Sequence, residues 1–169
     1  SSDSKGNIFV TGNFQSPTIN VGKTTLSNKG FDDIFVLKYD PNGALIWAKS
    51  FGQSSSEEGS DITVDVNDNI LITGYFKSSA LNFDTFTLER IQSRDLFLTK
   101  LNTDGSILWV KSAAGGAVNN PRVSTDLMGN VIFSGNYYVR DIVFGSIRLI
   151  NNGFSNVFIV KYNTEGNLS

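Results

Sequence analysis

The residue types that most often carry out acid–base or metal chemistry are missing from this chain of 169 residues, which contains no histidine and no cysteine. The commonest general base and the commonest transition-metal ligand are therefore absent, and so is thiol or disulfide chemistry. Many serines and threonines remain as nucleophiles, but only a lysine or a carboxylate could activate them, and no Gly-x-Ser-x-Gly elbow occurs. We therefore expect a non-catalytic protein with no catalytic, cofactor-binding or metal-binding residues.

Two pairs of adjacent carboxylates are the next candidates for chemistry, namely Asp32-Asp33 and Glu57-Glu58. Hydrolysis of a glycosidic bond needs two carboxyl groups that converge on that bond. Neighbouring residues of a strand point to opposite faces of the sheet, so we expect neither pair to converge.

The segment Asp65–Asn69 resembles the start of a calcium-binding loop, because oxygen-bearing side chains alternate along it. The glycine and the distal glutamate of an EF-hand are not at the required positions. The corresponding segments Asp3–Asn7 and Asp126–Asn130 place lysine or leucine among the would-be ligands. A hairpin turn explains all three segments and a cation explains one, so we expect turns.

Lysines also recur at a fixed spacing: Lys38, Lys100 and Lys161, and again Lys49 and Lys111. Such recurrence favours a structural role. We expect these lysines to pair with a repeated carboxylate such as Asp33 or Asp95, or to lie along a surface with a solvated head. A positively lined groove for an anionic ligand is the alternative.

The turn segments and the lysines recur because the chain contains nearly three copies of one pattern. The phrase Asn7–Gly12 returns as Asn69–Gly74 and as Asn130–Gly135, so that its closing glycines lie 62 and 61 residues apart. A second phrase recurs at the same step: Phe35–Gly43, Phe97–Gly105 and Phe158–Gly166. Self-similarity at a fixed period of this length indicates a repeat architecture, in which each unit needs neighbours to bury its apolar faces.

Each copy consists of short runs rich in β-branched and aromatic residues, separated by Gly, Asn, Asp and Ser. In the middle copy these runs are Ile62–Val66, Ile70–Phe76, Leu96–Leu101 and Ile107–Lys111. They are typical of antiparallel strands joined by hairpins, and no helical stripe occurs. An extra hairpin or excursion is expected between the second and third strands: Ile19–Leu26, Leu81–Leu88 and Ile142–Leu149.

Three sets of repeated residues have expected structural roles. Two sets fill left-handed turn positions: Gly43, Gly105 and Gly166, and again Gly6, Asp68 and Gly129. The strand-end glycines Gly12, Gly74 and Gly135 indicate close backbone approach, which suggests crowding near a shared axis. Trp47 and Trp109 are expected to stack between neighbouring units.

Four hairpin-linked strands repeated around an axis describe a β-propeller blade. We predict an all-β, antiparallel propeller segment of about three repeats of ~61 residues. The first blade covers about 3–60 and lacks its first strand, the second covers 61–121, and the third covers 122–169 and lacks its last strand. We expect the chain to be an excerpt of a larger propeller. Tandem β-sandwiches and a parallel solenoid are the rival architectures.

At these residues the chain resembles the bacterial SBBP repeat family, which is named for a seven-bladed β-propeller. The family's pattern joins Asp-x-x-Gly-Asn-aliphatic-x-Thr-Gly to Asp-x-Phe-x-x-Lys-x-x-x-x-Gly-x-x-x-Trp. The first copy matches it at Asp3, Gly6, Asn7, Thr11, Gly12, Asp33, Phe35, Lys38, Gly43 and Trp47. The middle copy matches it at Asp65, Asn69, Thr73, Gly74, Asp95, Phe97, Lys100, Gly105 and Trp109. The departures are Asp68 for Gly, Ser134 for Thr and Asn156 for Asp.

The resemblance implies a structural or interaction platform within a large secreted or cell-surface bacterial protein, used in adhesion or in binding a protein or a glycan. It implies flanking blades or other subunits as partners, an extracellular location and no catalytic motif. A scaffold domain of an extracellular enzyme, or a lectin, with its active residues mostly outside this segment, is the alternative; Tyr137 and Tyr138 are the only aromatic candidates for a glycan site.

Composition restricts the partners further. The net charge is −2, from 14 basic and 16 acidic residues, and no Lys/Arg cluster occurs, so nucleic-acid binding is not expected. No apolar run approaches the ~20 residues of a membrane helix, so direct membrane insertion is not expected either. The segments Gln53–Ser60 and Ala113–Arg122 occupy one position of the repeat yet differ in sequence. We expect them to be loops that carry binding specificity.

Overall fold

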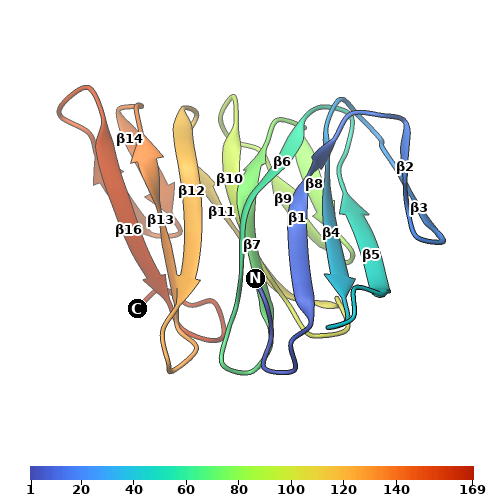
Figure 1. The fold of residues 1–169 in the computed structure, drawn as a ribbon. Coiled ribbons are helices and arrows are strands. Elements are labelled where there is room, and N and C mark those ends of the chain that lie inside the picture. The colour runs from blue at the N-terminus through green and yellow to red at the C-terminus, as the bar shows by residue number, and fades with distance from the viewer.

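The computed structural model describes all 169 residues, which form sixteen β-strands and no helix (Figure 1). The all-β prediction is therefore confirmed. The strands are β1 (Ile8–Phe14), β2 (Thr18–Val21), β3 (Thr24–Ser27), β4 (Asp33–Tyr39), β5 (Leu45–Phe51), β6 (Glu57–Val64), β7 (Ile70–Phe76), β8 (Ala80–Phe83), β9 (Phe86–Glu89), β10 (Asp95–Leu101), β11 (Ile107–Ala114), β12 (Val118–Thr125), β13 (Val131–Tyr137), β14 (Asp141–Phe144), β15 (Ile147–Ile150) and β16 (Asn156–Tyr162).

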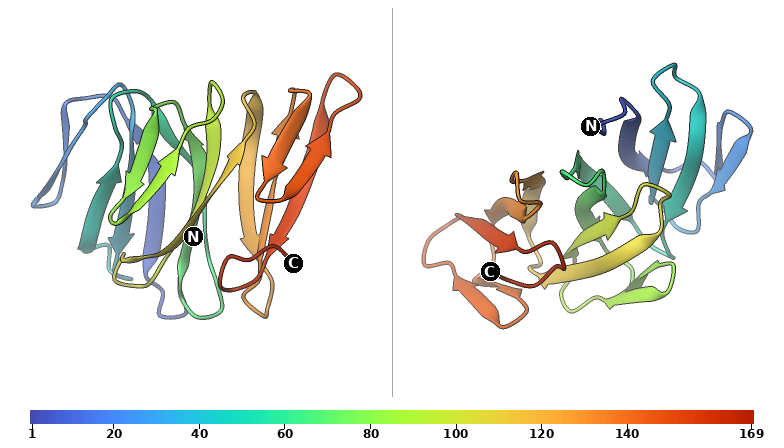
Figure 2. Two further views of the ribbon diagram at one scale, coloured as in Figure 1. Left: turned by 180° about the vertical axis from the view of Figure 1, so that it is seen from behind. Right: turned by 90° about the horizontal axis from the view of Figure 1, so that it is seen from below.

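The longer strands form three antiparallel groups that stand side by side and fan outward (Figure 2). The first sheet has the order β1-β4-β5, the second β6-β7-β10-β11, and the third β12-β13-β16. Sequential strands pair within each group, as hairpin connections require. The names first, second and third sheet refer below to these strands.

The short strands form the three extra hairpins that the repeat length predicts: β2–β3, β8–β9 and β14–β15. The third hairpin also pairs with the edge of the second sheet, where Ala113 faces Phe144. The second hairpin contacts the first sheet, because the rings of Phe83 and Phe51 lie 4.9 Å apart. Two of the hairpins thus contact the sheet that precedes them.

The hydrophobic cores lie between the sheets, and side chains alternate along the strands of the second sheet to fill both. Ile70 and Ile72 on β7 pack with Ile34 of the first sheet in one buried cluster. Leu98 on β10 packs with Phe133 of the third sheet in another. Both faces of the second sheet are therefore buried, and burial of this surface is the main force that holds the sheets together.

The turn glycines adopt the left-handed conformation that the sequence predicts. Gly43 and Gly105 have φ of 84° and 81°, and the strand register shifts next to both turns, as expected for a bulge. Asp68 fills the same conformation at φ 62°. Its carboxylate accepts hydrogen bonds from the amide and the hydroxyl of Ser4 at 2.8 and 2.7 Å. The aspartate therefore ties two turns together, which a glycine could not do.

The strand-end glycines allow close approach, as predicted: an added Cβ would clash with an aromatic ring at all three positions and, at Gly74, also with the backbone carbonyl of Glu58 on β6. Gly12 on β1 faces Phe35 on β4, and an added Cβ would lie 2.8 Å from the phenylalanine ring. The same 2.8 Å separates such a Cβ at Gly74 from Phe97 and at Gly135 from Phe158. Each glycine thus makes room for an aromatic ring of the neighbouring strand in its own sheet.

Candidate functional site

The repeated lysines pair with carboxylates, but not with the predicted Asp33 and Asp95. Lys100 lies 2.8 Å from Asp65, Lys38 4.0 Å from Asp3, and Lys161 3.1 Å from Asp126. The prediction was wrong because Asp33 and Lys38 lie near opposite ends of β4. Lys38 is near the turn that contains Asp3, because it pairs with Phe9 in the register of β1.

Asp33 and Asp95 instead organise the loops that precede their strands. Asp33 accepts a hydrogen bond from the Lys29 amide at 3.0 Å, and Asp95 accepts one from the Ile91 amide at 2.6 Å. Burial raises the pKa of Asp33, and the nearby charge of Glu57 raises it further.

Two of the lysines also join their sheet to the next one. Lys38 and Trp47 of the first sheet both donate hydrogen bonds to the carbonyl oxygen of Thr103, at 2.9 and 3.2 Å. Lys100 and Trp109 of the second sheet donate in the same way to Thr164, at 3.2 and 3.1 Å. Each acceptor is the second residue of an Asx-x-x-Gly turn in the following sheet. We call this set of donors and their carbonyl acceptor the turn latch. It places the tryptophans between neighbouring sheets, as predicted.

The calcium-like segment is a hairpin turn. One oxygen of Asp65 accepts the amides of Asn67 and Asn69 at 2.8 and 2.9 Å, and the other accepts the Lys100 ammonium. Burial alone would raise the pKa of Asp65, but hydrogen bonds from Lys100 and Asn69 together lower it below its usual range. No group of three or more acidic side chains in the structure is arranged to hold a metal ion.

The adjacent carboxylates point to different places, as predicted. Asp32 accepts a hydrogen bond from the side-chain amide of Asn13, whereas Asp33 accepts one from the backbone amide of Lys29. Glu57 is fully buried and accepts the amides of Gln53 and Ser78 at 2.7 and 3.1 Å. Neither pair therefore offers two carboxyl groups to one bond.

The two tyrosines considered for a glycan site differ in exposure. Tyr137 is buried in the core between the second and third sheets. Tyr138 is 39% exposed, and its ring packs edge-on against the exposed Phe154 at a centroid distance of 6.0 Å. Only Tyr138 therefore remains available to a ligand.

The two segments predicted as specificity loops are largely strands. Residues 57–60 belong to β6 and residues 118–122 belong to β12, so the connections themselves are short. Each strand contains a bulge, between Gly59 and Asp61 and between Asn119 and Arg122. Polar bulges break the alternation that would identify a strand from sequence. Pro121 is accommodated because it lies in such a bulge.

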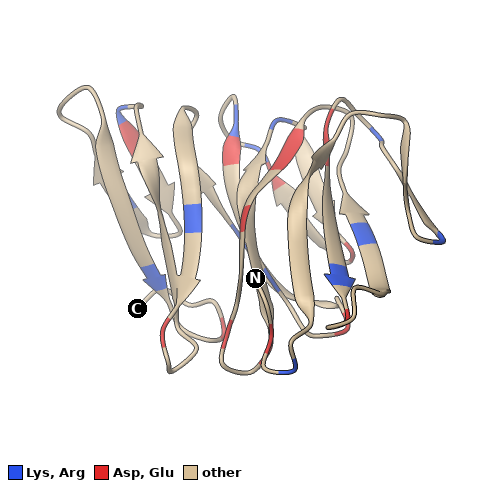
Figure 3. Cartoon of the chain, viewed as in Figure 1, with Lys and Arg blue, Asp and Glu red and all other residues tan.

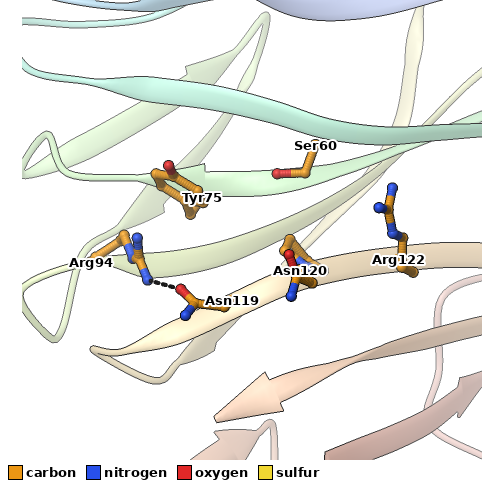
Figure 4. Close-up of a pocket in the computed structure, with 7 residues that line it drawn as sticks. Ser60, Tyr75, Arg94, Asn119, Asn120 and Arg122 are labelled. Atoms are coloured by element: carbon orange, nitrogen blue, oxygen red, sulfur yellow. Dashed lines mark hydrogen bonds between the residues drawn. The ribbon is translucent and has the colours of Figure 1, made fainter. Parts of the chain in front are cut away.

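The two bulges nevertheless meet, and between them lies a cavity of about 300 Å³ (Figure 4). We call it the bulge pocket, and its lining residues are Ser60, Tyr75, Arg94, Asn119, Asn120, Pro121 and Arg122. Both predicted segments therefore contribute to one site. Asn120 adopts a left-handed backbone at φ 52°, which is uncommon for a residue with a Cβ and directs the bulge.

Arg94 forms one wall of the bulge pocket and is held from two sides. Its guanidinium carbon lies 4.3 Å from the centre of the Tyr75 ring, a cation–π contact. It also donates to the Val118 carbonyl and to the Asn119 side chain. Burial raises the pKa of Tyr75 to about 12, helped by a hydrogen bond to Glu58. Tyr75 is thus a neutral phenol at physiological pH.

Arg122 forms the opposite wall and is held less closely than Arg94. Its side chain is 64% exposed and one nitrogen lies 4.0 Å from Asp61. Asp61 is itself fixed by the Val123 amide, which donates to its other carboxylate oxygen at 3.0 Å. The pocket thus combines one fixed and one exposed guanidinium with amide, hydroxyl and phenol groups. Such a set can bind oxygen-rich ligands through hydrogen bonds.

Sequence reasoning missed Tyr75 and Arg94, although a signal for them exists. Tyr75 occupies a repeat position where the other copies have asparagine (Asn13 and Asn136), and Arg94 one where they have Asp32 and Ser155. Tyr75 thus breaks a regular position of the repeat, and Arg94 lies at a variable one. Figure 3 shows that elsewhere acidic and basic residues are interspersed along the strands and turns.

Comparison with known protein families finds no match. The chain is similar to a protein of Acanthamoeba polyphaga mimivirus described as an uncharacterized WD repeat-containing protein, with 27% identity over 201 aligned residues. The alignment covers 97% of this chain and 14% of that relative. The structure contains no helix long and apolar enough to cross a membrane. Together, the all-β structure and the WD repeat-containing relative indicate a β-propeller-like repeat protein.

Proposed function

We propose that this chain is a non-catalytic interaction scaffold of the β-propeller type, and that it binds its partner through the bulge pocket. The observation that carries the proposal is a contrast within the repeat. Recurring residues build the turns and the latches, whereas the non-recurring Tyr75, Arg94 and Arg122 line one polar cavity. Binding residues placed on a fixed repeating frame are typical of interaction scaffolds.

We take the three sheets as successive blades of SBBP-like repeats. The antiparallel order β6-β7-β10-β11 and the cores between the sheets support this assignment. The period of about 61 residues exceeds the 40–45 residues of a WD40 blade, and the extra hairpins account for the difference. The description of the viral relative as WD repeat-containing supports the propeller architecture.

The partner that fits the pocket is a protein segment or glycan that presents carboxylate or hydroxyl oxygens. Arg94 is held in place and therefore loses little conformational freedom when it binds. Arg122 is exposed and would close on the ligand. The secreted, cell-surface and adhesive setting implied by the repeat resemblance belongs to this proposal. Cell fractionation and surface proteolysis of the native producer would test it.

The test of the proposed function is a binding screen of the purified chain against a glycan array and a peptide array rich in Asp and Glu. We expect ligands whose binding falls at least tenfold in the variants Arg94→Ala and Arg122→Ala. Arg148→Ala is the matched control, because Arg148 is 66% exposed, pairs with Asp141 on the neighbouring strand and does not line the bulge pocket. Ligands bound equally by all three variants would overturn the assignment of the pocket.

One observation favours a second candidate, a lectin site at the exposed Tyr138–Phe154 pair. Aromatic faces bind sugar rings through their apolar sides. Glycan binding that is lost in Tyr138→Ala but kept in Arg94→Ala would favour this site over the bulge pocket.

A further inference from the structure

The outer edge of β11 is only partly covered by another strand. On its inner side β11 pairs along its length with β10, but on its outer side only Ala113 and Ala114 pair with β14. The β14–β15 hairpin then turns, so residues 107–112 have no strand partner on the outer side. Such an edge offers unpaired backbone amides and carbonyls to an added strand.

Two cavities lie at this edge, on opposite faces of the sheet. One, of about 230 Å³, is lined by Lys111 and by a turn of the third sheet, and we call it the Lys111 cavity. The other, of about 370 Å³, is lined by Ala114 and Val143, and we call it the Val143 cavity. Ser112 and Gly145 border both. Alternation along β11 places Lys111 on the face that packs against the third sheet and Ala114 on the other face.

The side chain of Lys111 lies in the same surroundings as that of Lys49, its counterpart in the first sheet. A Cβ added at Gly166 would lie 2.8 Å from the Cε of Lys111, and one added at Gly105 would lie 3.1 Å from the Cε of Lys49. Each lysine stem therefore crosses the turn glycine of the following sheet.

The two ammonium groups nevertheless differ in their partners. Lys49 pairs at 3.4 Å with Asp84, which lies in the turn of the β8–β9 hairpin. Asp84 has a left-handed backbone at φ 51°, a conformation that favours glycine. The corresponding residue of the β14–β15 hairpin is Gly145, and no ion pair of the structure includes Lys111. Lys111 is thus built into the same site as Lys49 without the carboxylate.

We propose that an extended, acidic segment of a partner protein binds this edge as an added strand. Its backbone pairs with residues 107–112 of β11. An aspartate or glutamate of the segment takes the place beside Lys111 that Asp84 takes beside Lys49. The neighbouring residues of the segment point to the other face and are apolar, so that they fill the Val143 cavity.

The two cavities favour a peptide over an acidic glycan. Successive side chains of a strand point to opposite faces of the sheet, so one strand can occupy a cavity on each face. A sugar acid could neutralise Lys111 but could not continue the backbone ladder of β11. The site shares no lining residue with the bulge pocket, so the two proposals stand or fall separately.

The test selects eight-residue peptides from a displayed random library on the purified chain and measures their Kd by fluorescence anisotropy. We expect the selected peptides to carry Asp or Glu beside an aliphatic residue and to bind Lys111→Gln at least tenfold more weakly. Lys49→Gln is the matched control, because Lys49 packs in the same way but already has a carboxylate partner. It should leave the Kd unchanged.

The hairpin turn supplies a second pair of variants. Gly145→Asp would place a carboxylate where the other hairpin has Asp84, so it should compete with the peptide and weaken binding at least tenfold. The backbone suits this change, because φ is 56° at Gly145 and 51° at Asp84. Gly145→Asn has nearly the same shape without the charge, and we expect it to bind the peptide as the unmodified chain does.

Methylation of the peptide's amides tests for strand addition. Alternate amides of an added strand donate to its partner, so N-methyl groups at one set of alternate positions should abolish binding and at the other set should be tolerated.

Four results would overturn the proposal. Selection could yield no peptide that distinguishes the chain from Lys111→Gln, or both sets of N-methyl groups could be tolerated. Binding that is lost in Arg94→Ala but kept in Lys111→Gln would place the acidic peptide in the bulge pocket. An oligomer of galacturonic acid that binds through Lys111, where no peptide does, would identify a glycan as the occupant.

Discussion

The strands β10 and β16 occupy the same place in two successive sheets, and they differ mainly in what lies beside them. All seven residues of β10 are buried, whereas β16 alternates between buried and exposed residues. The buried residues of β16, such as Phe158 and Val160, face the second sheet. The comparison teaches that two-sided burial here is a property of a sheet between neighbours and cannot be read from the residues of one strand.

The largest difference is expected from a charge placed at the same position of both strands. Leu98→Asp would bury a carboxylate in the core between two sheets and cost at least ~4 kcal/mol of unfolding free energy. Ile159→Asp would leave the carboxylate in water and change stability by less than about 0.5 kcal/mol. Urea denaturation followed by tryptophan fluorescence would measure both. Equal losses of unfolding free energy would show that the positions of Leu98 and Ile159 are equally buried in solution.

The buried pair Asp65–Lys100 should contribute more to stability than the exposed pair Asp126–Lys161. Asp65→Ala leaves the buried Lys100 ammonium without its partner and should cost about 3–5 kcal/mol. The exposed pair should tolerate Asp126→Ala with a much smaller loss. The double variant Asp65→Asn/Lys100→Met is the control, because an asparagine can still accept the turn amides, as Asn102 does in its own turn. We expect it to recover most of the stability. A double variant as unstable as Asp65→Ala would contradict this explanation.

Turn glycines allow backbone strain to be separated from packing between sheets. Gly43 and Gly166 have φ of 84° and 78°, so alanine should strain both backbones by about 1 kcal/mol. An added Cβ at Gly43 meets nothing within 4 Å, whereas at Gly166 it would lie 2.8 Å from Lys111 and 2.9 Å from Trp109. Gly166→Ala should therefore cost about 1–3 kcal/mol more than Gly43→Ala in the same denaturation experiment. Similar costs would mean that the turn does not pack tightly on the second sheet.

A smaller effect is expected from the indole donor of the turn latch. Trp109→Phe removes the hydrogen bond to the Thr164 carbonyl but keeps most of the aromatic packing. The Lys100 ammonium still donates to that carbonyl, so no buried acceptor is left without a partner. We expect a loss of about 1 kcal/mol from denaturation midpoints. No loss at all would argue that the lysine alone forms the latch.

The smallest expected effect is on how the unfolding free energy falls at acid pH, and it is specific to Asp65. The pKa of Asp65 is lower in the folded chain than in the unfolded one, so its ionised form favours folding. This contribution is complete well above about pH 4 and is lost as the pH falls through the folded pKa. The variant Asp65→Asn/Lys100→Met should therefore lose less stability on acidification than the unmodified chain. If both chains lost the same stability on acidification, the lowered pKa of Asp65 would not be the cause of the acid sensitivity.

Local patterns gave reliable predictions of strands, hairpins and turns because the relevant information lies within a few residues. Asp68 and Gly105 have the predicted left-handed backbone, and Leu81–Leu88 is the predicted hairpin. The partner of Lys38 was mispredicted because it depends on register between strands, which places Asp3 and not Asp33 beside the ammonium.

The bulge pocket was only half predictable. The sequence indicated Gln53–Ser60 and Ala113–Arg122 as variable segments, but their bulges concealed that much of each is a strand. Arg94 and Tyr75 come from other elements and reach the pocket only through the packing of the second sheet against β12. Which distant residues line the pocket depends on the tertiary arrangement, and short-range sequence patterns cannot predict it.

The central claim is that neighbouring sheets bury and latch the repeated lysines, and competitive acetylation of the folded chain of 169 residues tests it most directly. The side chains of Lys38 and Lys100 are 9% and 3% exposed, against 46% for Lys161. The account predicts that Lys161 reacts rapidly while Lys38 and Lys100 react only after the chain is unfolded in urea. Equal reaction rates for all three lysines in the folded chain would contradict it.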